Sequence, residues 1–150
     1  SPNHYTSNGR LNGYKKAMTN AGLTITDDYI QCGDYCIDGG YEAMMRLCKL
    51  QKRPTAIFIS NYDMTIGAYL AINYLRLKIP DDISVIGFDN FPLANVVNPP
   101  LSFAEQPTNV MGTEAGKLLY RRICGDYSDY PKTIMHKPTM HYKESIRQLT

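Results

Sequence analysis

The chain has 150 residues, of which 43% are hydrophobic and 20% charged, and its formal net charge is +2. A chain of this length can bury roughly two-thirds of its unfolded surface in one domain, so it needs no disulfide or metal to fold. The near-average hydrophobic content excludes wholesale disorder. No run of roughly 20 apolar residues and no secretory signal are visible, so we predict no association with a membrane.

Charge and cysteine usage narrow the possible partners. The basic residues are spread along the chain without the stripe that a DNA-binding surface shows. Cys32 and Cys36 have three residues between them, but a zinc site needs two such pairs or a matched pair of histidines. We therefore expect no metal site and no cofactor, and free thiols kept in a reducing cytoplasm.

Helical and extended patterns alternate through the first 90 residues. Apolar residues recur at helical spacing in some segments, and continuous apolar runs in others are typical of strands buried on both faces. This alternation predicts an α/β fold, a parallel sheet flanked by helices and linked by right-handed crossovers. The expected elements are helices over 10–21, 38–48 and 63–77, a short strand over 29–32, and buried strands over 55–60 and 83–88.

The pattern changes after Phe88. A proline pair, Pro99-Pro100, interrupts the chain and is the best candidate for a hinge or a crossover between domains. An extended stretch over 101–106, a helix over 109–124 and an extended tail over 133–142 follow it.

Polar loops follow the three expected strands. In an open parallel sheet, ligands bind outside the carboxyl ends of the strands. Asn and Asp side chains there can hydrogen-bond a polyhydroxylated ligand, and an aromatic ring can stack on it. For single residues a structural role stays open, as a helix cap for Asp63 or a turn for Asp89. The three loops are Gly33-Asp34-Tyr35, Ser60-Asn61-Tyr62-Asp63 and Asp89-Asn90.

Arg10 opens the first expected helix. It is either a solvated surface arginine or a planar clamp for a carboxylate or a pair of hydroxyls.

Catalytic motifs find little support. The stretch from Gly112 to Lys117 resembles a phosphate loop, but only three residues separate its glycines and Leu118 follows the lysine. There is no Gly-x-Ser-x-Gly elbow, and the three histidines lie at the two ends of the chain. We predict no catalytic residue, and hence no enzyme.

The helix expected over 64–75 is apolar on almost all sides. A helix on one face of a sheet normally keeps a polar outer stripe, so this one is expected to bury a second face. A second copy of the chain is the favoured cover, and further polypeptide of the same protein is the alternative. The residues predicted for such a homodimer interface are Met64, Ile66, Tyr69, Leu70 and Asn73.

Several of these stretches together resemble one protein family. The segment Arg10-Leu-Asn-Gly13-Tyr14 is similar to the Arg-x-x-Gly-aromatic opening of a helix in lactose-repressor (LacI/GalR-type) transcription regulators. Residues 53–68 resemble their strand and helix before the effector loop, and 79–90 resemble the family's most recognisable stretch. Gln106 and Gly112 follow in the same order, so the resemblance covers nearly the whole chain.

The resemblance implies a type I periplasmic-binding-protein-like core with two α/β subdomains. Residues 1–104 would be part of the C-terminal subdomain, 105–131 a crossover and helix of the N-terminal subdomain, and 132–150 the return strand and tail. The DNA-binding helix-turn-helix of the family is absent from this chain, so operator DNA would be bound only through a missing N-terminal domain.

The resemblance also implies ligand contacts. Arg10, Asn61 and Asp89 are similar in position to the family's polar effector contacts, and Tyr35 to its aromatic wall. Thr6 and Asp63 are secondary candidates. The family usually has Asp directly after the strand-end Asn, whereas here Tyr62 stands there and Asp63 follows one place later.

Two functions are compared on this basis. The first is the effector-binding, dimer-forming core of a bacterial cytoplasmic repressor that responds to a sugar or a related small metabolite. The second is a secreted, monomeric periplasmic sugar-binding protein of a transporter. We expect that these 150 residues need a second copy or further polypeptide to cover their exposed faces.

Overall fold

The computed structural model of the chain describes residues 5–89 and 92–148 and is built around one sheet. The sheet has the strand order β1-β2-β3-β4, in which β1 to β3 are parallel and β4 runs antiparallel to β3. This confirms the predicted α/β fold with a parallel sheet flanked by helices. The strands are β1 (Ala56–Phe58), β2 (Ser84–Phe88), β3 (Ser102–Glu105) and β4 (Thr139–His141).

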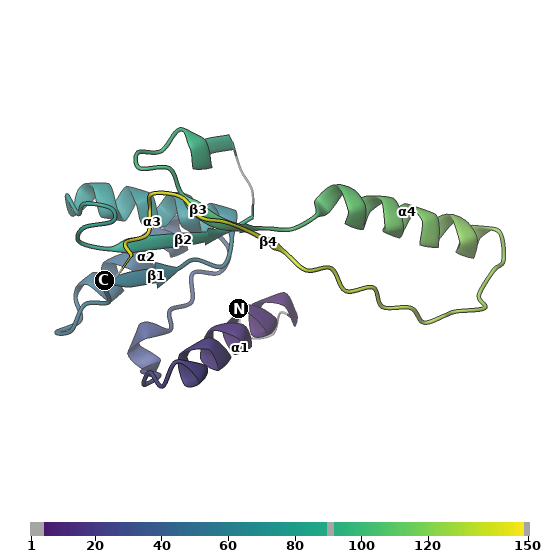
Figure 1. Ribbon diagram of the computed structural model, residues 1–150, viewed down its shortest axis with the longest axis horizontal. Coiled ribbons are helices and arrows are strands. Elements are labelled where there is room, and N and C mark those ends of the chain that lie inside the picture. Colours follow the sequence, from purple (N-terminus) through teal and green to yellow (C-terminus); the bar gives the residue numbers. More distant parts are fainter. Residues whose placement is uncertain (1–4, 90–91, 149–150) are drawn as a thin grey trace.

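The helices take three different positions around the sheet. Figure 1 shows α2 and α3 together beside the sheet, α1 set apart below it, and α4 extended away from it. The α4 helix is joined to the sheet by two extended stretches and has no buried residue. The helices are α1 (Tyr5–Asn20), α2 (Ile37–Cys48), α3 (Tyr62–Tyr74) and α4 (Thr108–Ile123), with short 3₁₀ turns η1 (Asp27–Tyr29) and η2 (Pro92–Asn95).

Glycines let α2 and α3 pack at very short range. A Cβ atom added at Gly67 would lie 1.9 Å from the carbonyl oxygen of Ile37, and one added at Gly40 would lie 2.4 Å from that of Met64. Only a residue without a side chain fits between two such backbones. The two helices are thereby fixed against each other, and they cover an apolar core that includes Met44, Ile72, Ile83, Val85 and Leu101.

The C-terminal tail returns to the sheet and closes it. Ser145 is fully buried; its hydroxyl donates to the Val85 carbonyl at 2.6 Å and accepts from the Ser102 N–H at 2.7 Å. Its backbone N–H donates to the Pro100 carbonyl. The tail therefore ties β2 to β3 at the ends opposite the candidate site.

The prediction of a strand over 29–32 is wrong. Its first residue ends η1, and Ile30 is extended but belongs to no strand. A large cavity separates this stretch from β1, so no neighbouring strand within the described part of the chain offers it a ladder of hydrogen bonds.

The prediction that the strand over 55–60 is buried on both faces is also wrong. Ala56 is exposed and Phe58 is 40% exposed, because β1 is an edge strand whose outer side borders the same cavity. The α2 helix begins at Ile37, and Cys36 caps it, since its sulfur accepts a hydrogen bond from the Gly39 N–H at 3.3 Å.

Candidate functional site

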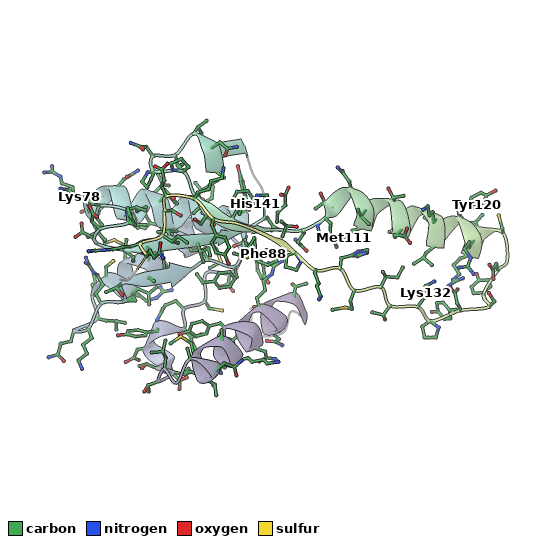
Figure 2. All side chains as sticks on the ribbon, in the orientation of Figure 1. Lys78, Phe88, Met111, Tyr120, Lys132 and His141 are labelled. Carbon is green, nitrogen blue, oxygen red and sulfur yellow. The ribbon has the colours of Figure 1, made fainter. Side chains whose placement is uncertain are left out.

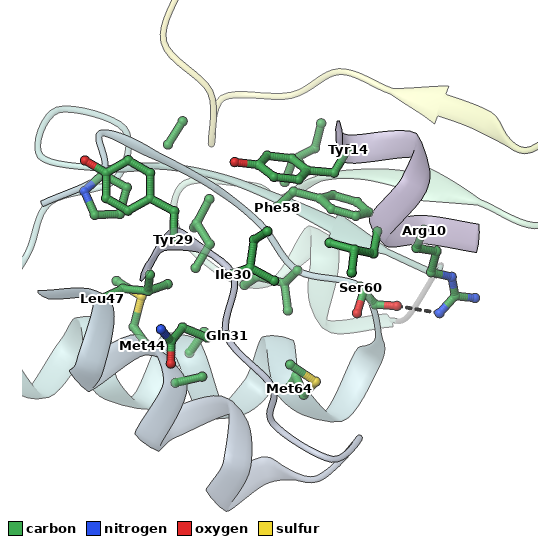
Figure 3. Close-up of a pocket in the computed structure, with 18 of the residues that line it drawn as sticks. Arg10, Tyr14, Tyr29, Ile30, Gln31, Met44, Leu47, Phe58, Ser60 and Met64 are labelled. Atoms are coloured by element: carbon green, nitrogen blue, oxygen red, sulfur yellow. Dashed lines mark hydrogen bonds between the residues drawn. The ribbon is translucent and has the colours of Figure 1, made fainter. Parts of the chain in front are cut away.

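Arg10 lies across the carboxyl ends of two strands. Its Nη1 donates to the carbonyl oxygen of Ser60, just after β1, at 2.5 Å (Figure 3). Its guanidinium carbon lies 3.8 Å from the centre of the Phe88 ring, at the end of β2. A guanidinium stacked on a ring in this way is held by a cation–π interaction. The α1 helix thus delivers a cation to the edge where ligands of parallel sheets bind.

Asp89 follows β2 in a strained backbone conformation. Its φ of 83° lies in the left-handed region, which costs a residue with a side chain on the order of 1 kcal/mol or more. The strain is held by a hydrogen bond from its N–H to the Ala104 carbonyl at 2.8 Å. Gln106 Nε2 donates to its Oδ1 at 2.5 Å. The carboxylate is therefore fixed in direction by residues of β3 and of the stretch that leaves it.

A polar cavity of about 360 Å³ opens beside this carboxylate. It lies where the chain leaves the sheet for α4, and its volume is in the range that small ligands occupy. The lining residues are Asp89, Glu105, Gln106 and Thr108.

Asn61 occupies the residue before α3 and carries an unpaired polar atom. The residue is 9% exposed, and its Oδ1 is buried without a hydrogen-bond partner in the described part of the chain. Its side chain does not cap the helix. A buried acceptor left unpaired costs about 1–3 kcal/mol, so this amide is suited to a donor that arrives with a ligand. Asp63 lies in the first turn of the same helix.

Tyr35 and Thr6 meet at the same edge. The Thr6 hydroxyl lies 3.5 Å from the Tyr35 hydroxyl, and either can donate. This hydrogen bond is the main cause that lowers the pKa of Tyr35; a hydrogen bond with Ser7 and the charge of Arg10 act in the same direction. Tyr35 has a φ of 60°, which sets its ring in a tight turn before α2.

The structure thus brings four of the predicted contacts into one region through Arg10. Its charge acts on Tyr35, whose hydroxyl lies 3.5 Å from that of Thr6. Asn61 and Asp89 directly follow Ser60 and Phe88, the two residues that Arg10 contacts. Asn90, also predicted at this edge, lies outside the described residues. Sequence reasoning missed Phe88 as the ring beneath Arg10, because an aromatic residue at a strand end looks like core. It also missed the contact of Gln106 with Asp89, although the resemblance included Gln106.

The connection from the sheet to α4 is reinforced across β3 and β4. His141 Nε2 lies 2.6 Å from Glu105 Oε2. The His141 ring also stacks on Phe103, with centroids 4.8 Å apart. These contacts hold β3 and β4 together where the chain leaves the sheet toward α4 and where it returns. Figure 2 labels His141 at this end of the sheet.

The residues predicted for a homodimer interface separate into two groups. Leu70 is 52% exposed, and Asn73 is exposed on the same side of α3, while Ile66 is half-buried. Met64 and Tyr69 instead pack against the core.

Other kinds of site find no support in residues 5–89 and 92–148. This part of the chain holds no cluster of side chains suited to a metal ion, and none of its four cysteines forms a disulfide bond. None of its helices is both long and apolar enough to span a membrane.

Comparison with known proteins places the chain in a family. Residues 1–146 match the periplasmic binding protein-like domain. The ribose operon repressor of Escherichia coli (strain K12) is 42% identical over 114 residues, which are 76% of this chain and 34% of the relative. The transcriptional repressor PurR of Histophilus somni (strain 2336) is 38% identical over 140 residues, 93% of this chain and 42% of the relative. The chain spans less than half the length of these relatives.

Solved structures agree with these matches. A sugar-binding transcriptional regulator of the LacI family from Escherichia coli, complexed with phosphate, has a TM-score of 0.83 and 30% identity. The match covers 97% of this chain and 52% of that one. The CelR–cellobiose complex has a TM-score of 0.84 and 29% identity, over 91% of this chain and 41% of that one. The chain belongs to the periplasmic binding protein-like domain family, and the proteins to which it is similar include regulators of the LacI family.

Proposed function

We propose that this chain is the effector-binding and dimer-forming core of a bacterial repressor and binds a sugar or a related small metabolite between Arg10, Asn61 and Asp89. The observation that carries the proposal is the Asp89 carboxylate, held in a strained conformation beside a polar cavity of about 360 Å³. Strained backbone is kept where function needs a side chain in a particular direction.

The chemistry of the site favours a ligand with several hydroxyl groups. A carboxylate accepts hydrogen bonds, a guanidinium donates them, and an amide does both, which together suit a sugar ring. Tyr35 adds an aromatic surface on which such a ring can stack. The solved CelR complex holds cellobiose, which supports a saccharide here.

A hydrogen bond connects Asp89 to the segment that leads to α4. Its partner Gln106 lies on the stretch that leaves the sheet for α4. A ligand that takes the Asp89 carboxylate competes with Gln106, and so it favours a different orientation of the α4 segment. A differential contact of this kind is what a ligand needs to shift an equilibrium between two conformations.

The assembly and location proposed here follow from this role. Residues 105–131 would belong to the N-terminal subdomain and 132–150 would return to the C-terminal one, with residues 1–104 forming most of the latter. The exposed side of α3 would pair with a second copy, and operator DNA would be bound through a separate helix-turn-helix domain in the cytoplasm. The alternative, a periplasmic sugar-binding protein of a transporter, is less favoured because the relatives compared are repressors.

The response of operator binding to sugars tests the proposal. In the full-length protein, we expect Asp89→Ala to abolish the change in operator affinity that the effector causes, measured by fluorescence anisotropy with labelled operator. Operator binding without effector reports that the variant is folded. Asp28→Ala, which removes an exposed carboxylate outside the site, is the matched control and should respond normally. A full response from the Asp89 variant would refute the assignment.

A further inference from the structure

A second carboxylate borders the cavity beside Asp89. Glu105 is the last residue of β3, and it lines the same polar cavity of about 360 Å³ as Asp89 does. Phe88 of β2 pairs with Ala104 of β3, so Asp89 and Glu105 each follow one member of that pair. The two acidic residues therefore lie at the carboxyl ends of two adjacent parallel strands.

Two stacked rings hold the Glu105 carboxylate. Phe103 is buried and forms part of the core. The His141 ring stacks on it, with an angle of 20° between the ring planes, and His141 Nε2 lies 2.6 Å from Glu105 Oε2. A functional side chain keeps its direction when the residues that hold it are themselves fixed by packing. The core thus orients Glu105, as Gln106 orients Asp89.

The lining of the cavity carries negative charge and, among the described residues, no basic side chain to balance it. Two of its residues are carboxylates, one is an amide and one a hydroxyl. The Arg10 guanidinium contacts the Ser60 carbonyl and the Phe88 ring and is not part of this lining. A carboxylate has about four lone-pair positions, so it can accept from a ligand as well as from the protein. The cavity is therefore suited to hydrogen-bond donors and unsuited to anions.

We propose that Glu105 is a specificity-determining residue of the effector site. Together with Asp89 it selects ligands that turn hydroxyl or amino groups toward the cavity, and it excludes phosphorylated and carboxylated ones. His141 is a positioning residue that holds the Glu105 carboxylate. This inference rests on the proposed function, because it takes the ligand to be bound at Asp89, and it adds the charge of that ligand.

The test varies the charge of the ligand on a fixed sugar ring. Isothermal titration calorimetry of the full-length protein compares glucose with glucosamine and glucuronate, galactose with galactosamine and galacturonate, and ribose with ribose 5-phosphate. For each neutral sugar that binds, we expect its acidic derivative to bind at least about 10-fold more weakly. Its amino derivative, which also brings hydrogen-bond donors, should bind at least as tightly as the neutral sugar.

Glu105→Gln separates the effect of charge from that of structure, because it removes one unit of charge and keeps the shape of the side chain. We expect amino sugars to bind more weakly and acidic sugars more tightly, each by about 10-fold, the effect of one charge about 10 Å away at the effective dielectric constant of a protein surface. The neutral sugar should change least, whereas a disturbed fold would shift all three in the same direction. Glu42→Gln, at a side chain 70% exposed on α2, is the matched control and should leave all three unchanged.

A double-mutant cycle tests the role of His141. His141→Phe keeps a ring against Phe103 and removes the nitrogen that faces Glu105. We expect it to weaken binding of the neutral sugar by about 3- to 10-fold in the unmodified protein and to have no further effect in Glu105→Ala. His141→Gln, which retains an N–H donor, should restore part of the loss. Operator binding without effector reports that each variant is folded.

Three outcomes would overturn the proposal. The first is an acidic sugar that binds the unmodified protein as tightly as its neutral form. The second is a Glu105→Gln variant in which all sugars shift alike or none shifts. The third, an equal loss from His141→Phe in both backgrounds, would overturn the role assigned to His141. In all three cases sugar binding persists and the proposed function stands, whereas absence of binding by every neutral sugar would refute both.

Discussion

Whether a buried polar atom without a hydrogen-bond partner is suited to bind a ligand depends on where it lies in the fold. The Asn61 amide oxygen and the Tyr69 hydroxyl both lack a hydrogen-bond partner in the described part of the chain. Asn61 follows directly on Ser60, which Arg10 contacts, at the edge of the sheet where a ligand is proposed to bind. Tyr69 lies in the middle of α3 against the core. Burial raises the pKa of Tyr69 to about 12, since the phenolate would be desolvated there.

The Tyr69 hydroxyl therefore lowers the free energy of unfolding and makes no stabilising contact. We expect Tyr69→Phe to raise the free energy of unfolding by about 1 kcal/mol at pH 7, because it removes an unpaired buried hydroxyl and keeps the ring. Urea unfolding measures this. Tyr29→Phe is the matched control, as the Tyr29 hydroxyl donates to the Lys52 carbonyl at 2.9 Å; it should lose up to about 1 kcal/mol.

The stability of Tyr69→Phe should also depend less on pH above pH 10 than that of the unmodified chain. The folded-state pKa of Tyr69, about 12, exceeds the ordinary 10.0, so the neutral phenol favours the folded state. This contribution is complete below pH 10 and is lost as the pH rises toward 12. The unmodified chain should therefore lose stability over that range more steeply than Tyr69→Phe. A fall in stability of the variant at pH 7 would show that the hydroxyl has a partner.

At the residue scale, the sequence could predict the edge of the sheet but not its internal contacts. The rule that ligands bind at the carboxyl ends of strands selects Asn61 and Asp89 from sequence order alone. It does not predict that Gln106 holds the Asp89 carboxylate or that Phe88 lies under Arg10. Those contacts depend on how β3 and α1 are placed in three dimensions.

At the scale of elements, the apolar runs of the sequence predict where the strands lie, but they do not predict which strands are buried. The runs at 55–60 and 83–88 do contain β1 and β2. Of these two strands, however, only β2 has a neighbouring strand on both sides, and β1 is exposed beside the cavity that borders it. Periodicity reports which residues avoid water, but it does not report which segment covers them. The failed strand at 29–32 has the same cause, because a strand needs a partner that local sequence does not supply.

The exposed side of α3 is the element proposed to pair two copies. Leu70 is 52% exposed there, so a charge at this position leaves the core of the chain intact. We expect the full-length protein to sediment as a dimer, and Leu70→Asp to convert it into a monomer in sedimentation velocity. Gln51→Asp, which places the same charge on an exposed turn after α2, should stay dimeric. A dimer that survives Leu70→Asp at micromolar concentration would move the interface elsewhere.

At the scale of the molecule, apolar surfaces of the described residues stay uncovered. It matches well under half the length of the curated relatives compared. The α4 helix has no buried residue and carries exposed apolar side chains such as Leu119, Tyr120 and Ile123. The chain thus has the hydrophobic content of a globular domain, although its α4 helix and the outer edge of β1 are not covered by other described residues. Composition counts apolar residues and cannot tell which of them lie against one another.

The proposed function requires that a small polyhydroxylated ligand binds where Arg10 crosses the strand ends. Isothermal titration calorimetry of the full-length protein against a panel of sugars measures this binding. We expect one sugar to bind with one site per chain and Arg10→Ala to weaken its binding by about 10- to 100-fold, the loss expected for a hydrogen bond to a charged group. Lys16→Ala, an exposed position on the same helix, should bind normally. Unchanged affinity in Arg10→Ala, or no binding by any sugar, would contradict it.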